Sequence, residues 1–163
     1  LTEFDERYVF HRMGYNFRMA DPPASFGIEQ VKKLDTLNDQ RIKNAKFYID
    51  NFDEKLRSIF QIPSLNEAEI KHTFYAFPLA IKPDVNISRS KITRYLASKG
   101  IETRAIFCGT LPDQPCLKKA PGRTSGSLPV SRWLRDKAFF IGCDPGLGQN
   151  DLEYVIKTLK EIC

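Results

Sequence analysis

The chain has 163 residues, 42% of them hydrophobic and 28% charged, which suits a single folded domain and excludes wholesale disorder. No apolar run approaches the roughly 18 residues that a membrane-spanning helix needs, and the acidic first residues are unlike a signal peptide. The sequence therefore predicts a cytoplasmic protein with no membrane partner. Because the chain starts with Leu1 rather than Met, we also expect a processed or excised piece of a longer protein.

The net charge of +5 is unevenly distributed. Residues 1–60 contain ten basic and ten acidic residues, whereas residues 89–137 contain eleven basic and only three acidic ones. Such a local excess can attract a polyanion such as nucleic acid, or a small anion such as a nucleoside diphosphate. The segment has no dense basic tract and no nucleic-acid-binding motif, so the small anion fits at least as well, and an ordinary solvated surface is the further alternative.

The four cysteines, at positions 108, 116, 143 and 163, include no CxxC pair, and the two histidines stand far apart in the sequence. A zinc site usually needs such paired ligands, so no metal site is expected. Four cysteines without an export signal indicate reduced thiols in the cytoplasm rather than disulfides.

Residues 1–21 predict an irregular or extended N-terminal segment that is rich in aromatic side chains and turns at Gly14-Tyr15-Asn16. A helix is expected to start at Asp21, because Asp is a favoured N-cap and the prolines that follow it are tolerated in a first turn.

Apolar residues between positions 28 and 59 mostly recur at steps of three and four. This pattern predicts a long helix, or two abutting helices, with one buried face. The step from Leu37 to Ile42 is too long for that pattern, so a bend or a break is expected near Asn38.

Three later segments have the aromatic and β-branched content of strands: Thr73–Lys82, Ile101–Phe107 and Ala138–Gly142. Pro78 places the first of them at a sheet edge or a bulge, because proline cannot donate to a strand ladder. A loop over residues 108–127, rich in Gly and Pro, is long enough to be functional.

Three helices are expected among these strands. The first runs from a Ser88 cap to Lys99 and stops at Gly100, and the second covers Pro129–Lys137. The last is capped by Asn150 and buries the face formed by Leu152, Val155, Ile156, Leu159 and Ile162. The whole pattern predicts an α+β fold, a long helix plus a small three-stranded sheet covered by helices.

Four stretches, in their order and spacing, carry a family resemblance: Gly14-Tyr-Asn-Phe-Arg-Met-Ala-Asp21, Gly100-Ile-Glu-Thr-Arg104, Thr103–Pro115 and Phe139–Leu147. Through them nearly the whole chain resembles the C-terminal part of the DegT/DnrJ/StrS family of sugar aminotransferases, enzymes of fold type I that depend on pyridoxal 5'-phosphate (PLP). The last two stretches are most similar to the CDP-4-keto-6-deoxy-D-glucose-3-dehydrase branch. The chain departs from that branch at Gly109-Thr110 and at Pro22-Pro23.

This resemblance implies that a large PLP-binding domain precedes the chain. That domain would supply the Asp opposite the pyridine nitrogen, and either the Schiff-base Lys or the His that replaces it in the dehydrase branch. Residues 1–21 would then lie near the cofactor and the dimer interface, and residues 22–163 would form the C-terminal small domain. The chain alone is expected to hold no catalytic residue, to bind no cofactor and to be inactive, whereas the full-length enzyme would be a homodimer.

The resemblance also implies a role for individual polar residues. Asn16 would reach the PLP phosphate of the neighbouring subunit, since a turn amide can donate to a phosphate oxygen; the structural alternative is that it serves its own backbone. Arg18 and Arg104 are candidates for the diphosphate or the sugar hydroxyls of the substrate, because guanidinium forks bind such groups, and ion pairs are the alternative.

Three more residues are candidate substrate contacts. His72, just before the first predicted strand, would contact the sugar or make a structural hydrogen bond. Thr110 and Gln114 lie in the loop that, by the resemblance, lines the sugar site.

The expected function is therefore that of the C-terminal domain of a PLP-dependent 3-dehydrase or aminotransferase. The substrate would be a keto-deoxy sugar carried on a nucleotide diphosphate, in deoxysugar, lipopolysaccharide or antibiotic biosynthesis. Whether Lys or His faces the cofactor separates the two reactions, and that residue lies outside this chain. The alternative is a non-catalytic module that binds nucleic acid or another polyanion through residues 89–137.

Overall fold

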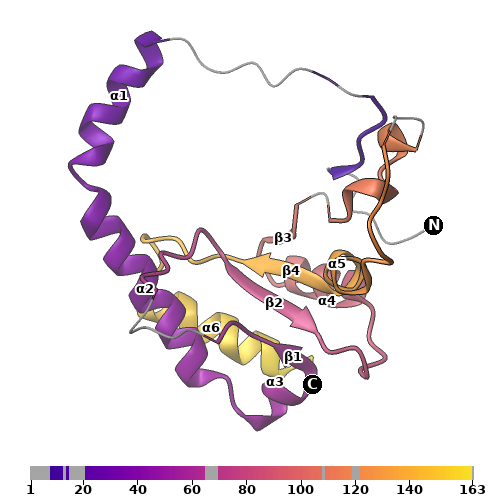
Figure 1. Cartoon of the computed structure of the whole chain (residues 1–163). Coiled ribbons are helices and arrows are strands. Elements are labelled where there is room, and N and C mark those ends of the chain that lie inside the picture. The colour runs from indigo at the N-terminus through magenta and orange to yellow at the C-terminus, as the bar shows by residue number, and fades with distance from the viewer. Residues whose placement is uncertain are drawn as a thin grey trace.

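The computed structural model describes residues 8–12, 14, 21–64, 70–107, 109–118 and 122–162. Its α-helices are α1 (Asp21–Val31), α2 (Leu34–Asn51), α3 (Glu54–Ile59), α4 (Arg89–Ser98), α5 (Pro129–Lys137) and α6 (Gln149–Lys160). Its strands are β1 (Phe60–Gln61), β2 (Phe77–Ile81), β3 (Thr103–Ala105) and β4 (Ala138–Ile141), and two 3-10 turns, η2 (Leu111–Asp113) and η3 (Pro115–Leu117), lie in the long loop. Figure 1 shows how these elements are arranged.

The described strands form one antiparallel sheet of four, in the order β1-β2-β4-β3. The α+β class is confirmed, but the prediction of three strands is wrong. The additional strand, β1, is two residues long and pairs Phe60 with Ile81, which is too short to leave a periodic signal in the sequence. Because β1 reaches only as far as Ala80, Pro78 has no strand opposite it on that side and its missing N–H is tolerated in β2.

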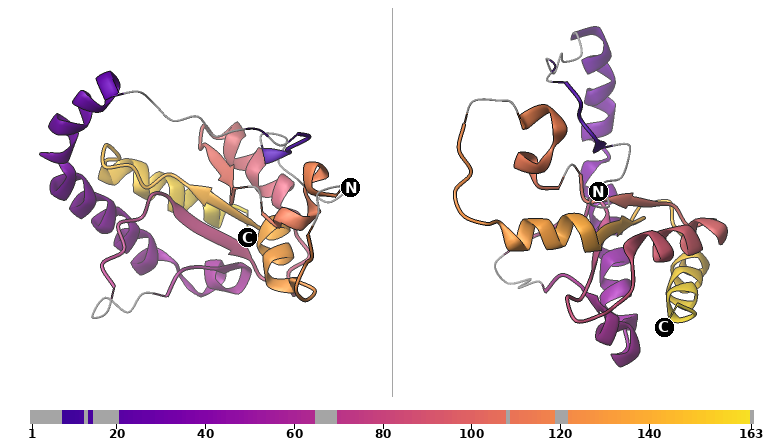
Figure 2. Two further views of the ribbon diagram at one scale, coloured as in Figure 1. Left: turned by 45° about the horizontal axis from the view of Figure 1, so that its top comes forward. Right: turned by 90° about the vertical axis from the view of Figure 1, so that its right-hand side faces the viewer.

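One face of the sheet carries the hydrophobic core. Phe77, Leu79 and Ile81 of β2 and Phe139 and Ile141 of β4 are all at most 1% exposed. Helices α2, α3 and α6 lie together on this side of the sheet in Figure 1 and in the right-hand view of Figure 2. Helix α4 contributes Ile92 and Leu96 to the same core. The inward face predicted for the last helix is confirmed, because its four residues from Leu152 to Leu159 are buried in this cluster and Ile162 packs against it.

The other face of the sheet is covered by loops rather than helices. Phe140 of β4 points to this face, and its ring meets Phe107 edge-to-face at 6.0 Å. Phe107 in turn contacts Tyr8, whose ring centroid lies 6.4 Å away. The described part of the N-terminal segment and the η2–η3 loop therefore lie on this side of the sheet (Figure 1). We call this side, opposite the core, the open face.

The break between the first two helices, α1 and α2, lies at a different position from the one predicted. The helix continues through Asn38, and the break lies at Lys32–Lys33, between α1 and α2. Figure 1 shows α1 standing away from the sheet, and its apolar residues Phe26, Ile28 and Val31 are exposed. The predicted single buried face therefore holds only from α2 onward.

Local backbone geometry sets the remaining ends of strands and helices. Two of the predicted strands are shorter than expected because Phe74 and Phe107 have φ of 43°, outside the extended region. The Ser88 cap is confirmed, since its side chain accepts a hydrogen bond from the Lys91 amide. The predicted Asn150 cap is wrong: α6 is capped at Gly148, whose amide donates to the Asp151 carboxylate.

Among the described residues, no helix combines the length and the apolarity needed to cross a lipid bilayer.

Candidate functional site

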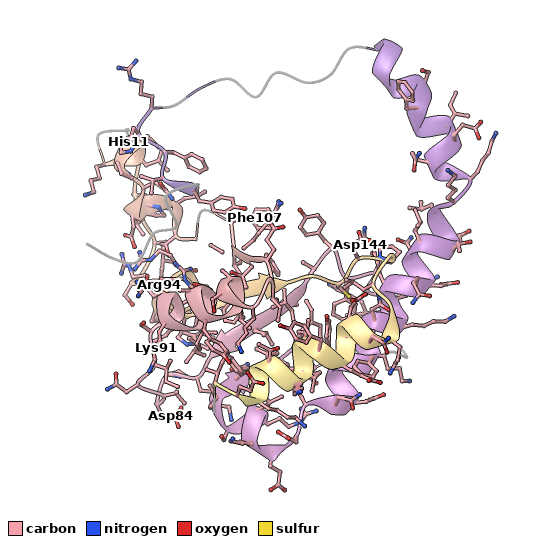
Figure 3. The ribbon with its side chains drawn as sticks, turned by 180° about the vertical axis from the view of Figure 1, so that it is seen from behind. His11, Asp84, Lys91, Arg94, Phe107 and Asp144 are labelled. Carbon is pink, nitrogen blue, oxygen red and sulfur yellow. The ribbon has the colours of Figure 1, made fainter. Side chains whose placement is uncertain are left out.

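A pocket of about 250 Å³ opens where α2 meets the ends of β2, β3 and β4. Polar and aromatic side chains line it, among them Arg41, Tyr75, Glu102, Arg104, Phe140 and Asp144. Figure 3 shows Asp144 and Phe107 on the side of the sheet that faces α1, whereas Asp84 and Lys91 lie on the far side. We refer to this pocket, on the open face, as the open-face pocket.

Helix α2 supplies one wall of the open-face pocket through Arg41, and Asn44, one turn further along, holds the adjoining loop. Arg41 donates from Nη1 to the Tyr75 carbonyl at 3.1 Å, and its Nη2 lies 3.8 Å from the Asp144 carboxylate. Asn44, which is 1% exposed, donates to the Asp144 carbonyl at 2.7 Å. These contacts fix the turn after β4 against the helix, so the pocket's rim is held by hydrogen bonds from α2.

Strand β3 supplies the opposite wall. Arg104 lies across from Phe140 in the β3–β4 register, and its Nε donates to Glu102 at 3.1 Å. The guanidinium is charged, as in any arginine, and this hydrogen bond raises the pKa of Arg104 further. The Arg104 side chain is half exposed and can still present its remaining N–H groups to a ligand.

At the back of the pocket, Cys143 is buried. Its thiol lies 3.3 Å from the Arg41 carbonyl, and burial raises its pKa to about 11. A raised pKa favours the protonated thiol at neutral pH, so Cys143 is a poor candidate for a nucleophile.

Gln114 joins the long loop to the N-terminal segment. Its side chain is fully buried and bonds in both directions, donating to the Tyr8 carbonyl at 2.9 Å and accepting from the Phe10 amide at 3.0 Å. The Cys116 amide adds a hydrogen bond to the Phe10 carbonyl at 2.9 Å. Gln114 thus acts on the backbone a few residues before the Gly14-Tyr15-Asn16 turn.

Thr110 is also buried, at 2% exposure, but its hydroxyl has no hydrogen-bond partner within the described part of the chain. A buried hydroxyl without a partner costs roughly 1–3 kcal/mol. This position therefore fits a site that a further polar group completes.

His72 lies apart from the open-face pocket. It lines a separate cavity of about 300 Å³ together with Ile42, Lys46 and Phe74. Its Nδ1 accepts a hydrogen bond from the Phe74 amide at 3.1 Å, and the two rings are 4.4 Å apart. This is the structural hydrogen bond that the sequence left open as the alternative for His72.

Of the remaining predicted site residues, Asn16 and Arg18 lie outside the described residues, so their predicted roles stay predictions. The structure brings Arg104 into a pocket with Arg41 and Tyr75, which the sequence analysis did not single out. Arg41 does leave a signal: it stands four residues after Leu37 and so occupies the gap in the apolar stripe. A charged residue on the buried stripe of a helix indicates a polar contact beneath it.

Several cations of the basic segment 89–137 are bound within the fold rather than free to meet a polyanion. Arg89 is 7% exposed and donates to the Arg135 carbonyl, and Lys137 donates to the Val85 and Ile87 carbonyls. Arg132 and Arg135 bind acidic side chains within the same segment. Among the described residues there is no cluster of His, Cys, Asp or Glu that could hold a metal ion.

Comparison with known proteins identifies the relatives of this chain. The profile of the DegT/DnrJ/EryC1/StrS aminotransferase family matches residues 2–160. The lipopolysaccharide biosynthesis protein RfbH of Salmonella typhimurium is 28% identical over 97% of this chain and 36% of its own length. The GDP-4-keto-6-deoxy-D-mannose 3-dehydratase of Yersinia pseudotuberculosis is also 28% identical, over 99% of this chain and 39% of its own length.

Solved structures share the same fold. The structure of the Escherichia coli GDP-4-keto-6-deoxy-D-mannose-3-dehydratase with bound hydrated PLP matches with a TM-score of 0.76 at 26% identity, over 95% of this chain and 39% of that one. The aminotransferase from Psychrobacter cryohalolentis matches with a TM-score of 0.78 at 20% identity. The chain spans little more than a third of the length of its curated relatives.

Proposed function

The chain belongs to the DegT/DnrJ/EryC1/StrS aminotransferase family, and from this membership we propose that it is the C-terminal domain of a PLP-dependent enzyme acting on a nucleotide-linked keto-deoxy sugar. The reaction is a 3-dehydration or a transamination, in a deoxysugar, lipopolysaccharide or antibiotic pathway. The observation that carries the proposal is the alignment of nearly the whole chain with enzymes named as sugar 3-dehydratases, at up to 28% identity.

The chemistry of the open-face pocket suits the substrate side of such an enzyme. Its lining offers two guanidinium groups, a tyrosine and the carboxylates of Glu102 and Asp144, but no lysine. Guanidinium forks suit diphosphate and sugar hydroxyls, whereas PLP needs an amine or an imidazole at the reacting carbon. On this proposal the guanidinium groups would face the diphosphate, the carboxylates would accept from sugar hydroxyls, and the reactive group would come from another part of the protein.

PLP, when bound, supplies the electron sink for the reaction. Within this chain, Asn16 would donate to the cofactor phosphate in the neighbouring subunit of a homodimer, and residues 1–21 would lie near that interface. Gln114 would hold the backbone at Tyr8 and Phe10, a few residues before Asn16, in place. The buried Thr110 hydroxyl would gain a hydrogen-bond partner in the complete site. Arg18 and Arg104 would bind the diphosphate or the sugar hydroxyls, with Arg41 beside Arg104 in the pocket.

On this proposal residues 22–163 form the small domain and the chain alone is inactive. His72 lines a different cavity from Arg104, so it would contact the sugar only if the sugar occupied that cavity. Arg104, in the open-face pocket, is the stronger candidate for a substrate contact. The alternative of a polyanion-binding module is not supported by a specific observation, because Arg89, Arg132 and Lys137 are bound within the fold.

The test uses the protein at the length that its own gene encodes. The purified protein should carry PLP, visible as its absorbance band, and Asn16→Ala should weaken PLP binding at least tenfold. The matched control is Asn86→Ala, at an exposed asparagine in the loop before α4, which should leave PLP binding unchanged. Absence of PLP binding by the unmodified protein would overturn the proposal.

The substrate site is tested separately. Arg104→Ala should raise KM for a nucleotide-linked 4-keto-6-deoxy sugar at least tenfold, while Arg94→Ala should not. Arg94 is an exposed arginine on α4 that donates to the Ser90 carbonyl within its own helix, so the two variants remove the same kind of side chain. Equal effects of both variants would exclude a direct role for Arg104.

A further inference from the structure

Two arginines of α5 bind one carboxylate in the long loop. Asp113, at the end of η2, accepts from Arg132 through both oxygens, with Nε and Nη2 each at 3.0 Å. Arg135, one turn further along α5, donates to the same carboxylate. Its other N–H groups bind Asp136 at 2.7 and 2.9 Å. We call Asp113 with Arg132 and Arg135 the α5 clip.

The α5 clip is built into the fold rather than formed at random on the surface. The Arg135 side chain is only 5% exposed, and its carbonyl accepts from the buried Arg89. Gly109 packs directly on the Arg135 stem, because a Cβ at position 109 would lie 2.5 Å from Cγ of Arg135. The loop just before η2 is therefore held against α5 by the packing of Gly109, and the end of η2 by the charge of Asp113.

Gln114 follows Asp113 directly. Its amide donates to the Leu111 carbonyl within η2, so the position of its side chain depends on how η2 is held. That side chain makes the two hydrogen bonds to Tyr8 and Phe10 described above. A continuous series of bonds thus runs from α5, through Asp113 and Gln114, to the N-terminal segment.

We propose that the α5 clip positions the N-terminal segment, with Asp113 as the positioning residue that fixes Gln114 and through it the backbone at Tyr8–Phe10. Among the described residues, Asp113 reaches the N-terminal segment through its neighbour Gln114, and the Cys116 amide adds a second bond from the same loop to the Phe10 carbonyl. If the N-terminal segment contacts PLP, a premise that rests on the proposed function, the α5 clip also sets the affinity of the protein for PLP.

The first test is hydrogen exchange in the protein at its genetically encoded length. Asp113→Asn keeps the shape of the side chain and removes its charge. The Phe10 and Cys116 amides should then exchange at least tenfold faster, while amides of α6 keep their wild-type rates. Asp84→Asn, at an exposed turn on the far side of the sheet, is the matched control and should change neither set (Figure 3). Unchanged exchange at Phe10 and Cys116 in Asp113→Asn would overturn the proposal.

The second test asks whether Asp113 acts through Gln114. Gln114→Ala removes both side-chain bonds to the N-terminal segment and should accelerate exchange at Phe10 to a similar degree. In the double variant the Phe10 amide should exchange less than twofold faster than in either single variant, since both changes interrupt one series of bonds. Additive effects in the double variant would show that the two residues act independently and would contradict the proposal.

A third readout separates positioning from general damage to the fold. At saturating PLP, Asp113→Asn should keep kcat within twofold of wild type, while the PLP dissociation constant rises at least fivefold. Equal losses in kcat and in PLP affinity would point to a disrupted fold and count against the clip. If the wild-type protein binds no PLP, the proposed function fails, and hydrogen exchange alone still decides the positioning role of Asp113.

Discussion

Arg104 and Phe140 lie directly opposite each other on the antiparallel strands β3 and β4, on the face of the sheet away from the core. Their chain neighbours, Ala105 and Phe139, form the next pair in the register and are both buried. Side chains alternate between the two faces of a strand, so one step along β4 separates a core residue from a residue that lines the open-face pocket. The two phenylalanines should therefore respond very differently to the same substitution.

Phe139→Ala should lower the free energy of unfolding by about 3–5 kcal/mol, because it leaves a cavity in a fully buried core. Phe140→Ala should cost about 1 kcal/mol, chiefly the lost edge-to-face contact with Phe107. Urea unfolding followed by circular dichroism measures both. Equal losses would mean that the open face is packed as tightly as the core.

Gly109→Ala should destabilise the protein more than Gly100→Ala. Both glycines have positive φ, 64° and 77°, and an alanine there costs about 1–2 kcal/mol in each case. At Gly109 the new methyl group would also overlap the Arg135 stem, whereas nothing lies within 4 Å at Gly100. We expect an additional loss of about 1–3 kcal/mol at Gly109, measured by urea unfolding. A smaller loss at Gly109 than at Gly100 would contradict the close packing on Arg135.

The stability that Asp113 contributes should depend on pH in a defined direction. Its hydrogen bonds with Arg132, and secondly those with Arg135, hold the pKa of this carboxyl below its usual range. A carboxyl with a lowered pKa in the folded state stabilises the fold above its unfolded pKa of about 3.9, and this stabilisation is lost as pH falls through the folded pKa.

The difference in unfolding free energy between wild type and Asp113→Asn should therefore be constant from pH 7 down to about 5, and should shrink below about pH 4. Urea titrations at a series of pH values give this difference. A difference that grows on acidification would show that the pKa is raised instead.

The two described cysteines should differ in reactivity. Cys116 is partly exposed, whereas Cys143 is 1% exposed with a pKa raised to about 11. Iodoacetamide at pH 8, followed by peptide mass spectrometry, should modify Cys116 in the folded protein and Cys143 only after denaturation. Rapid native modification of Cys143 would indicate that the wall of the open-face pocket opens readily.

Much of the fold follows from local signals in the sequence. The bounds of α5, the Ser88 cap of α4 and the inward face of α6 were predicted because caps and periodicity act within a few residues. The sequence does not predict the strand ends near Phe74 and Phe107, because a phenylalanine has no intrinsic preference for positive φ. Tertiary packing imposes that geometry, so local propensity does not report it.

The candidate site was less predictable, for a physical reason. Arg41 contacts Tyr75 and Asp144, and Asn44 contacts Asp144, across separations of 34 to 103 residues. The sequence shows these polar residues only as an interruption of an apolar stripe, which suggested a helix break near Asn38 that does not occur. A polar residue inside a helical stripe has two interpretations, a break or a buried polar contact, and only the fold distinguishes them.

The alternation along β4 has a practical consequence for protein engineering. Phe140 and Arg104 can be randomised together as a small library while the interior side of the sheet stays untouched. Variants with an altered pocket lining should then fold without compensating mutations, because the residues that form the core belong to a separate set.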